Sequence, residues 1–228
     1  MRFPRVPGAI AAYLFLVFAL PALAARAQSS PTAGRAAKPG PLADRALAAG
    51  GVSDGVYRNR DLGFFCKIPP AWVLRTEDLN AHDEGGTASA PSNNNSKTEP
   101  GRVLLAAFSR PPQARAEDVN SSILIATESA AAYPGLKDAA QYFGPLTEIT
   151  KGQGFTAVGD PYEFAVGAKT LPRGDFQKDV GSRVMRQSTL VMLARGYVVS
   201  FTFIGGTEDE VEELIGGLSF APSRKSTK

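Results

Sequence analysis

Few side chains in this 228-residue sequence could carry out chemistry, because it contains one histidine and one cysteine. His82 stands beside Asp83 and Glu84, and a metal site there would require three consecutive side chains to converge. An extended chain opposes this, since neighbouring side chains point apart. Any Ser-His-Asp or Cys-His arrangement would have to use the same histidine. We therefore predict no catalytic residues, no metal ligands and no cofactor site around His82.

The cysteine, Cys66, lies in the apolar segment Phe64-Phe65-Cys66-Lys67-Ile68. Strand alternation places Phe64, Cys66 and Ile68 on one face, which favours a small buried side chain. A reactive thiolate instead needs exposure and nearby positive charge. A lone cysteine also excludes an intramolecular disulfide and a zinc site with two or more thiolates. A nucleophilic or intermolecular thiol is the alternative.

Carboxylates, an adhesion-like tripeptide and the lone tryptophan are the remaining candidates. Glu163 or Asp175 could belong to a glycosidase-like carboxylate pair, but with 22 acidic residues such pairs are easily found. The tripeptide Arg173-Gly174-Asp175 matches a cell-adhesion sequence, although a turn after Pro172 explains it better. Trp72 is expected to cover the edge of a core instead of stacking on a ligand. No glycine-rich phosphate loop is present, so no nucleotide cofactor is predicted.

The start of the chain has the organisation of a secretory signal peptide. Arg2 and Arg5 precede an apolar stretch from Ala9 to Leu20, and small residues then offer cleavage sites after Ala24 and after Ala27, of which we favour the second. The apolar stretch is shorter than the roughly 20 residues of a membrane-spanning helix. We expect cleavage of residues 1–27, no transmembrane segment in the mature chain and a secreted or periplasmic location, with an uncleaved anchor as the alternative.

Charge limits the kinds of partner. Removal of the signal peptide takes away Arg2, Arg5 and Arg26 and leaves as many basic as acidic residues. A nucleic-acid-binding protein normally concentrates a basic excess on one face. We therefore expect no nucleic-acid partner, and predict that the partner is a protein or a small ligand that the sequence does not identify.

Composition divides the mature chain into three parts. Residues 28–53 are rich in Ser, Pro, Ala and Gly and are predicted to form a flexible linker. Residues 54–222 are predicted to form one globular domain. Residues 223–228 are predicted to form a basic, disordered tail. Within the domain, the polar stretch from Asn80 to Arg102 predicts a long exposed loop.

Apolar patterning places the main elements of the domain. Strands are predicted at 62–68, 103–108 and 122–127, and helical spacing over 136–151 carries an expected break at Gly144-Pro145. Strands at 184–194 and 197–204 are joined by the two-residue loop Arg195-Gly196. In the second of these strands, the face that carries Ser200 and Thr202 is expected to meet water. A capping box from Thr207 to Glu210 begins a terminal helix.

Both ends of this domain resemble PsbP-like domains. The opening resemblance lies in Tyr57, Leu62-Gly63-Phe64 and the run from Ile68 to Trp72. The closing resemblance lies in Gly196 to Phe201, the following helix and Leu218-Ser219-Phe220. The resemblance implies an α+β fold in which helices flank a central antiparallel β-sheet, an α/β/α sandwich.

The same resemblance bears on function. Known members of the family are mostly non-catalytic: an extrinsic photosystem II subunit, a Ran-GTPase-binding relative and periplasmic bacterial proteins. No catalytic residue carries over, and the polar stretch 80–102 departs from the family pattern. The sequence thus predicts an exported, non-catalytic binding or scaffold protein. The alternatives are an extracytoplasmic carboxylate-based hydrolase and an envelope-associated accessory protein attached through residues 28–53.

Overall fold

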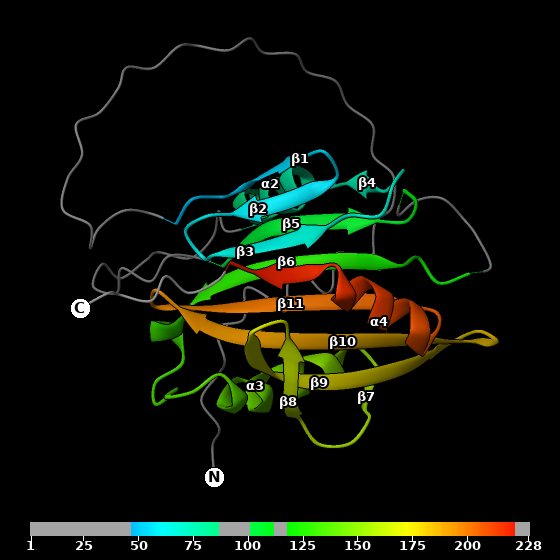
Figure 1. Cartoon of the computed structure of the whole chain (residues 1–228). Helices are drawn as coiled ribbons and strands as arrows, with labels where there is room; N and C mark the ends of the chain where they lie inside the picture. Colours follow the sequence, from blue (N-terminus) through cyan, green and yellow to red (C-terminus); the bar gives the residue numbers. More distant parts are fainter. Residues whose placement is uncertain (1–46, 87–100, 112–117, 222–228) are drawn as a thin grey trace.

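The structure is a computed structural model that describes residues 47–86, 101–111 and 118–221 (Figure 1). The predicted signal peptide, linker residues 28–46 and the tail at 223–228 lie outside the described residues. Most elements of the described part are strands in two antiparallel sheets. The predicted α+β class with a central antiparallel sheet agrees with this arrangement.

The larger sheet has eight strands in the order β4-β5-β6-β11-β10-β9-β7, and β8 also pairs with β9. Its longest strands, β9, β10 and β11, form consecutive antiparallel pairs. The strands are β4 (Val73–Leu74), β5 (Arg102–Phe108), β6 (Ser122–Ser129), β7 (Thr156–Ala157), β8 (Tyr162–Val166), β9 (Lys169–Val180), β10 (Arg183–Ala194) and β11 (Tyr197–Gly205).

The smaller sheet has four strands in the order β1-β2-β3-β12. Its strands are β1 (Gly51–Ser53), β2 (Val56–Asn59), β3 (Phe64–Lys67) and β12 (Leu218–Phe220). The last strand returns from the far end of the domain to pair with β3, and Leu218 lies opposite Cys66. The two ends of the domain are therefore joined in one sheet, with β1 at its edge.

The smaller sheet and α4 cover one face of the larger sheet, and α2 and α3 cover the other. The helices are α2 (Thr76–Gly86), α3 (Phe143–Gly152) and α4 (Glu208–Gly216), with short 3-10 turns η1 (Ala130–Ala132) and η2 (Ala140–Tyr142). Figure 1 shows the smaller sheet and α4 in front of the larger sheet. On the opposite face, Leu79 of α2 packs against β5, and Leu146 of α3 belongs to a cluster with Phe176 of β9. The predicted layers thus need one correction: one face is covered by a second sheet together with α4, not by helices alone.

The main core fills the space between the sheets. The ring of Phe64 meets that of Phe201 edge-on, with centroids 4.9 Å apart. Ser200 and Thr202, which were expected to meet water, are buried at 3% and 4% exposure. That expectation was wrong because β11 is an interior strand whose second face is also covered. The Thr202 hydroxyl is satisfied by Thr189, 3.1 Å away.

Two local predictions at the end of the chain are confirmed. Arg195 and Gly196 both have positive φ, at 53° and 81°, as a two-residue type I′ hairpin requires. Thr207 caps α4, because its hydroxyl accepts the Glu210 N–H at 3.2 Å. The Glu210 carboxylate reaches back to the N–H of Gly206 at 2.8 Å. The capping box therefore closes one residue earlier than its usual form.

Two other local predictions were wrong. The helix predicted over 136–151 is shorter than expected: α3 begins only at Phe143, after the 3-10 turn η2, and Pro145 lies in its first turn, where a missing N–H costs little. The stretch 80–86, expected to be loop, continues α2, while residues 87–100 lie outside the described residues. Acidic residues Glu77 and Asp78 in the first turn and buried Leu79 favour this helix.

The linker also ends earlier than predicted. Leu47 packs against the main core, and β1 occupies residues 51–53. The Tyr57 hydroxyl donates to the Ala49 carbonyl at 2.5 Å, and the Asn59 amide donates to the Ala48 carbonyl at 3.0 Å. These contacts fix residues 47–50 to β2, so the sheet begins before residue 54.

Candidate functional site

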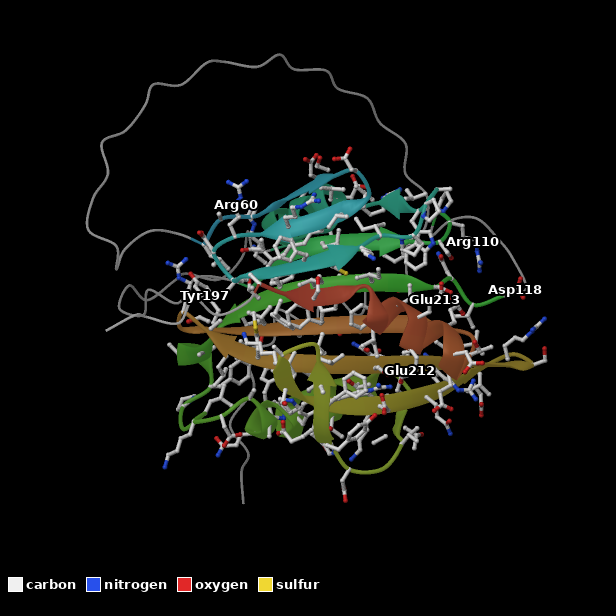
Figure 2. The ribbon with its side chains drawn as sticks, in the orientation of Figure 1. Arg60, Arg110, Asp118, Tyr197, Glu212 and Glu213 are labelled. Atoms are coloured by element: carbon white, nitrogen blue, oxygen red, sulfur yellow. The ribbon has the colours of Figure 1, made fainter. Side chains whose placement is uncertain are left out.

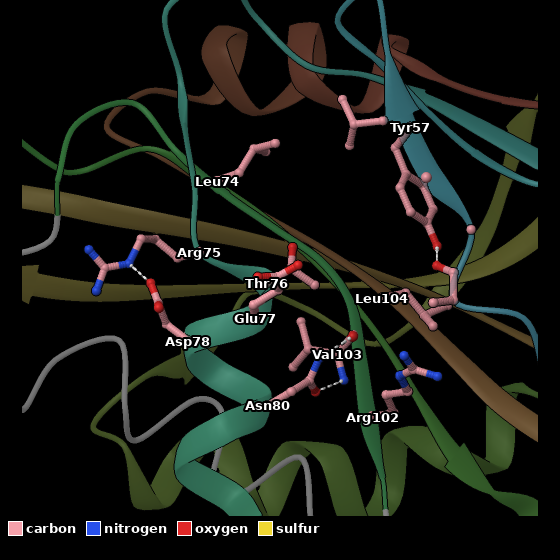
Figure 3. Close-up of a pocket in the computed structure, with 14 residues that line it drawn as sticks. Tyr57, Leu74, Arg75, Thr76, Glu77, Asp78, Asn80, Arg102, Val103 and Leu104 are labelled. Carbon is pink, nitrogen blue, oxygen red and sulfur yellow. Dashed lines mark hydrogen bonds and ion pairs between the residues drawn. The ribbon is translucent and has the colours of Figure 1, made fainter. Parts of the chain in front are cut away.

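A cavity of about 420 Å³ opens between β1 and the first turn of α2 (Figure 3). This volume is typical of a small-molecule site. Figure 3 shows α2 on one side of the cavity, with Tyr57, Leu104 and Arg102 on the other. The lining residues are Ala49, Gly50, Gly51, Val52, Tyr57, Leu74, Arg75, Thr76, Glu77, Asp78, Asn80, Arg102, Val103 and Leu104.

One wall of the cavity is the edge of β5, which α2 closes. The Asn80 amide donates to the Val103 carbonyl, and the Val103 N–H donates to the Asn80 amide oxygen, both at 3.0 Å. The Thr76 hydroxyl accepts the Ala106 N–H at 3.0 Å, and the Arg75 N–H donates to the Ala106 carbonyl at 2.9 Å. These four bonds replace a neighbouring strand, so this edge is chemically satisfied.

The opposite wall is formed by the segment that enters β1. Gly50 has φ +73°, and a Cβ there would lie 2.5 Å from the Tyr57 hydroxyl oxygen. Glycine is therefore required for the backbone to approach Tyr57 this closely. Burial raises the pKa of Tyr57, while a hydrogen bond to Asn59 and the charge of Arg102 offset part of the shift. Tyr57 is thus a neutral, fixed part of the wall.

The charges of the cavity are partly unpaired. Arg75 and Asp78 form an ion pair within α2. Glu77 and Arg102 form no ion pair with any described residue, and both side chains are exposed. Val52 and Leu74 add aliphatic surface at 42% and 45% exposure. The cavity therefore offers one cation, one anion and two exposed aliphatic side chains to a ligand.

A second polar cluster surrounds Arg173, which is 4% exposed on β9. Its guanidinium contacts Asp175 at 2.8 Å and Glu212 at 2.5 Å, and lies 4.7 Å from the ring centroid of Phe164. Figure 2 shows Glu212 on the side of α4 that faces β10. Burial alone would lower the pKa of Arg173, but hydrogen bonds and charges from Glu212 and Asp175 outweigh burial and raise it. The cluster connects α4 to β8 and β9.

This cluster contains two of the sequence-predicted candidates. The tripeptide Arg173-Gly174-Asp175 lies inside strand β9, so the turn expected there was wrong. Asp175 also accepts hydrogen bonds from Ser188 at 2.5 Å and from Tyr162 at 2.9 Å. Glu163 is exposed, and its carboxylate forms no hydrogen bond or ion pair with the described residues. The structure therefore does not bring Glu163 and Asp175 together as a carboxylate pair.

The remaining candidates lie elsewhere. Cys66 is fully buried in the main core, and burial raises the pKa of its thiol to about 12, which agrees with the predicted structural role. Trp72 is half-buried and packs against the same core, as expected. His82, Asp83 and Glu84 lie on α2 instead of in a loop, and their side chains are outside the described part. No helix in the described residues is long and apolar enough to span a membrane.

The cavity was not predicted from the sequence. Its polar residues come from two places, the turn into α2 and the start of β5, with Asn80 and Arg102 at the two ends of the stretch interpreted as loop. A signal was present in Thr76-Glu77-Asp78, which resembles the start of a helix. Nothing in the sequence shows that this helix lies beside β1.

Comparisons with known proteins identify no family for this chain. No family model matches, and no curated protein matches. Among solved structures, LpqN of Mycobacterium tuberculosis, described as involved in cell envelope biogenesis, overlaps 70% of this chain and 83% of its own, with 13% identity and a TM-score of 0.34.

Two further solved structures overlap as loosely. A protein of unknown function, PA94 of Pseudomonas aeruginosa, overlaps 54% of this chain and 78% of its own, with 14% identity and a TM-score of 0.32. A Bacteroides thetaiotaomicron protein overlaps 71% of this chain and 46% of its own, with 10% identity and a TM-score of 0.31. At these TM-scores, no function is transferred to this chain.

Proposed function

We propose that this chain is an exported, non-catalytic binding protein of the PsbP-like type whose ligand occupies the cavity between β1 and α2. The observation that carries the proposal is the composition of that cavity. Two charged side chains without ion-pair partners among the described residues, Arg102 and Glu77, stand beside exposed Val52 and Leu74. Such a mixture of apolar surface and a few polar groups is typical of a ligand site.

Several features support binding over catalysis. The Cys66 thiol is buried and protonated, so it is a poor nucleophile. The carboxylates of Asp175 and Glu212 both contact Arg173. This supports a structural role for the two carboxylates, and not the acid and base roles of a hydrolase. Export is supported by the sequence of residues 1–27.

Chemical-shift mapping tests the proposal. The ¹⁵N-labelled protein is titrated with pools of small polar metabolites and short peptides, and perturbed amides are assigned. We expect perturbations to gather at residues 49–52, 74–80 and 102–104. Val52→Trp, which fills part of the cavity from an exposed position, should abolish them, whereas Val158→Trp should not.

The two variants form a matched pair. Val158 is similarly exposed, at 49%, and follows β7 at the opposite end of the larger sheet from β4. Perturbations that are scattered over the surface, or that survive Val52→Trp unchanged, would contradict a ligand site in this cavity.

A further inference from the structure

We propose that the ligand is an extended peptide segment that carries a carboxylate. The peptide pairs as an added strand with the free edge of β1 and places its carboxylate beside Arg102. This inference rests on the proposed function, since it assigns a ligand class to the same cavity. It follows from the free N–H and C=O of Val52 in β1, the apolar side chains next to them and the charge at one end of the cavity.

The hydrogen-bond pattern of the β1–β2 hairpin leaves the backbone N–H and C=O of Val52 without hydrogen bonds to β2. Asp54 and Gly55 form its two-residue turn, with φ of 52° and 68°. The pair that closes such a turn, Ser53 and Val56, is hydrogen-bonded, and pairs alternate along an antiparallel ladder. Val52, opposite Tyr57, is therefore in a non-hydrogen-bonded pair. Its N–H and C=O point away from β2.

The ladder between β2 and β3 shows the same alternation of hydrogen-bonded and non-hydrogen-bonded pairs. The Ile68 N–H donates to the Gly55 carbonyl at 2.8 Å, so Gly55 directs its backbone groups toward β3. Two residues later, Tyr57 must do the same, opposite Cys66. Tyr57 therefore has no backbone group left for Val52. The Val52 N–H and C=O form no hydrogen bond with any described residue.

The two edges that border the cavity differ. The β5 edge is closed by side chains and backbone of α2, notably the two bonds between Asn80 and Val103. The β1 edge has no such cover in the described residues, and it ends the smaller sheet. An exposed edge is a template for another extended chain. A strand added there would lie over the cavity.

Side chains around this edge suit an extended chain. Val52 lies on the same sheet face as buried Tyr57, yet it is 42% exposed because it is at the edge. Leu74, at 45% exposure, is on the α2 side of the cavity. Alternate side chains of an added strand point to one face, so apolar peptide residues can contact Val52 and Leu74 while the backbone pairs with β1.

The charged side chains of the cavity determine the orientation of the peptide and favour a peptide with an acidic group. Arg102 forms no ion pair with the described residues, whereas Arg75 is paired with Asp78. Figure 3 shows Glu77 on α2, across the cavity from Arg102. A carboxylate is therefore attracted by Arg102 and repelled by Glu77. The carboxylate can be a chain terminus or an acidic side chain, and both place the same group at Arg102.

Selection with two peptide libraries tests the inference with the full chain. One library contains random hexapeptides with free C-terminal carboxylates, and the other contains amidated hexapeptides with one fixed internal aspartate. Affinities of selected peptides are then measured by fluorescence anisotropy on the wild type, Val52→Pro, Val52→Thr and Arg102→Gln. Val52→Pro removes an N–H that the fold does not use, and edge strands accept proline. Val52→Thr keeps the N–H.

We expect Val52→Pro to weaken binding about fivefold to tenfold, the value of one net hydrogen bond. Arg102→Gln should weaken it by about tenfold or more, because the lost bond is charge-assisted. Val52→Thr changes the side chain but keeps the N–H, so it should weaken binding by less than Val52→Pro does. Enrichment from the first library alone identifies a terminal carboxylate, and enrichment from the second identifies an acidic side chain; either supports the proposal. Peptides that bind Val52→Pro as tightly as the wild type overturn it.

A wild-type measurement covers the case in which Val52→Pro fails to fold. Hydrogen exchange of the Val52 amide should slow by about tenfold or more when a selected peptide is added, and unchanged exchange overturns strand addition. If neither library yields a binder while metabolite pools still perturb residues 49–52 and 102–104, the peptide inference fails and the proposed function stands. If neither libraries nor pools bind, both fail.

Discussion

Replacing Asn80 by alanine should open the edge of β5. The Asn80 side chain makes two hydrogen bonds to the backbone of Val103, each 3.0 Å long, and Val103 is 1% exposed. Each bond contributes about 1 kcal/mol net, and a buried peptide group that loses its partner costs about 1–3 kcal/mol. We therefore expect Asn80→Ala to lower the free energy of unfolding by about 2–4 kcal/mol.

Urea unfolding followed by fluorescence measures this loss, because the lone tryptophan, Trp72, packs against the main core. Asn80→Asp keeps the acceptor for the Val103 N–H but loses the donor, so it should also destabilise. Glu148→Ala, which removes an exposed ion pair with Lys151, is the control and should change stability by less than about 0.5 kcal/mol. A loss below that value for Asn80→Ala would refute the edge-closing role of the amide.

Three further predictions follow from buried groups. Arg173→Met leaves two carboxylates without their shared partner and should cost about 3 kcal/mol in urea unfolding; an unchanged midpoint would count against the cluster. Cys66 should react with a thiol reagent only after unfolding, since its pKa is raised to about 12; rapid reaction of the folded protein would show exposure. Burial and the neighbouring charge of Glu128 raise the pKa of Tyr142, so the folded state favours the neutral phenol. Stability should therefore be full below the unfolded pKa of 10.0 and fall as pH rises above it, less steeply in Tyr142→Phe. Equal unfolding energies at about pH 9 and pH 11 would contradict this.

Features set by local interactions could be predicted from the sequence. Arg195-Gly196 accommodates positive φ at both positions, and Thr207 precedes an acidic first turn, so neighbouring residues determine the hairpin and the start of α4. The burial of Cys66 follows from simple alternation. These elements can be predicted without knowing which distant residues they contact.

Features set by distant contacts could not be predicted. The alternation of Ser200 and Thr202 predicts a solvent-facing side of the strand. The sequence does not show that a distant residue, Thr189, forms a hydrogen bond with the Thr202 hydroxyl. Asn80 was predicted to lie in a loop, because its hydrogen bonds are made to the backbone of Val103, which belongs to another element. The second sheet also depends on β12 returning to β3. The cavity combines residues from β1, α2 and β5, so its site residues could not be found by spacing.

The proposed strand addition concerns the kind of ligand, whereas the first question is whether any ligand binds in the cavity between β1 and α2. Equilibrium dialysis of the wild type, Val52→Trp and Val158→Trp against pooled extracellular metabolites and short peptides, quantified by mass spectrometry, answers it most directly. A ligand site between β1 and α2 predicts compounds retained by the wild type and Val158→Trp and lost from Val52→Trp. Equal retention by all three proteins, or retention by none, would contradict it.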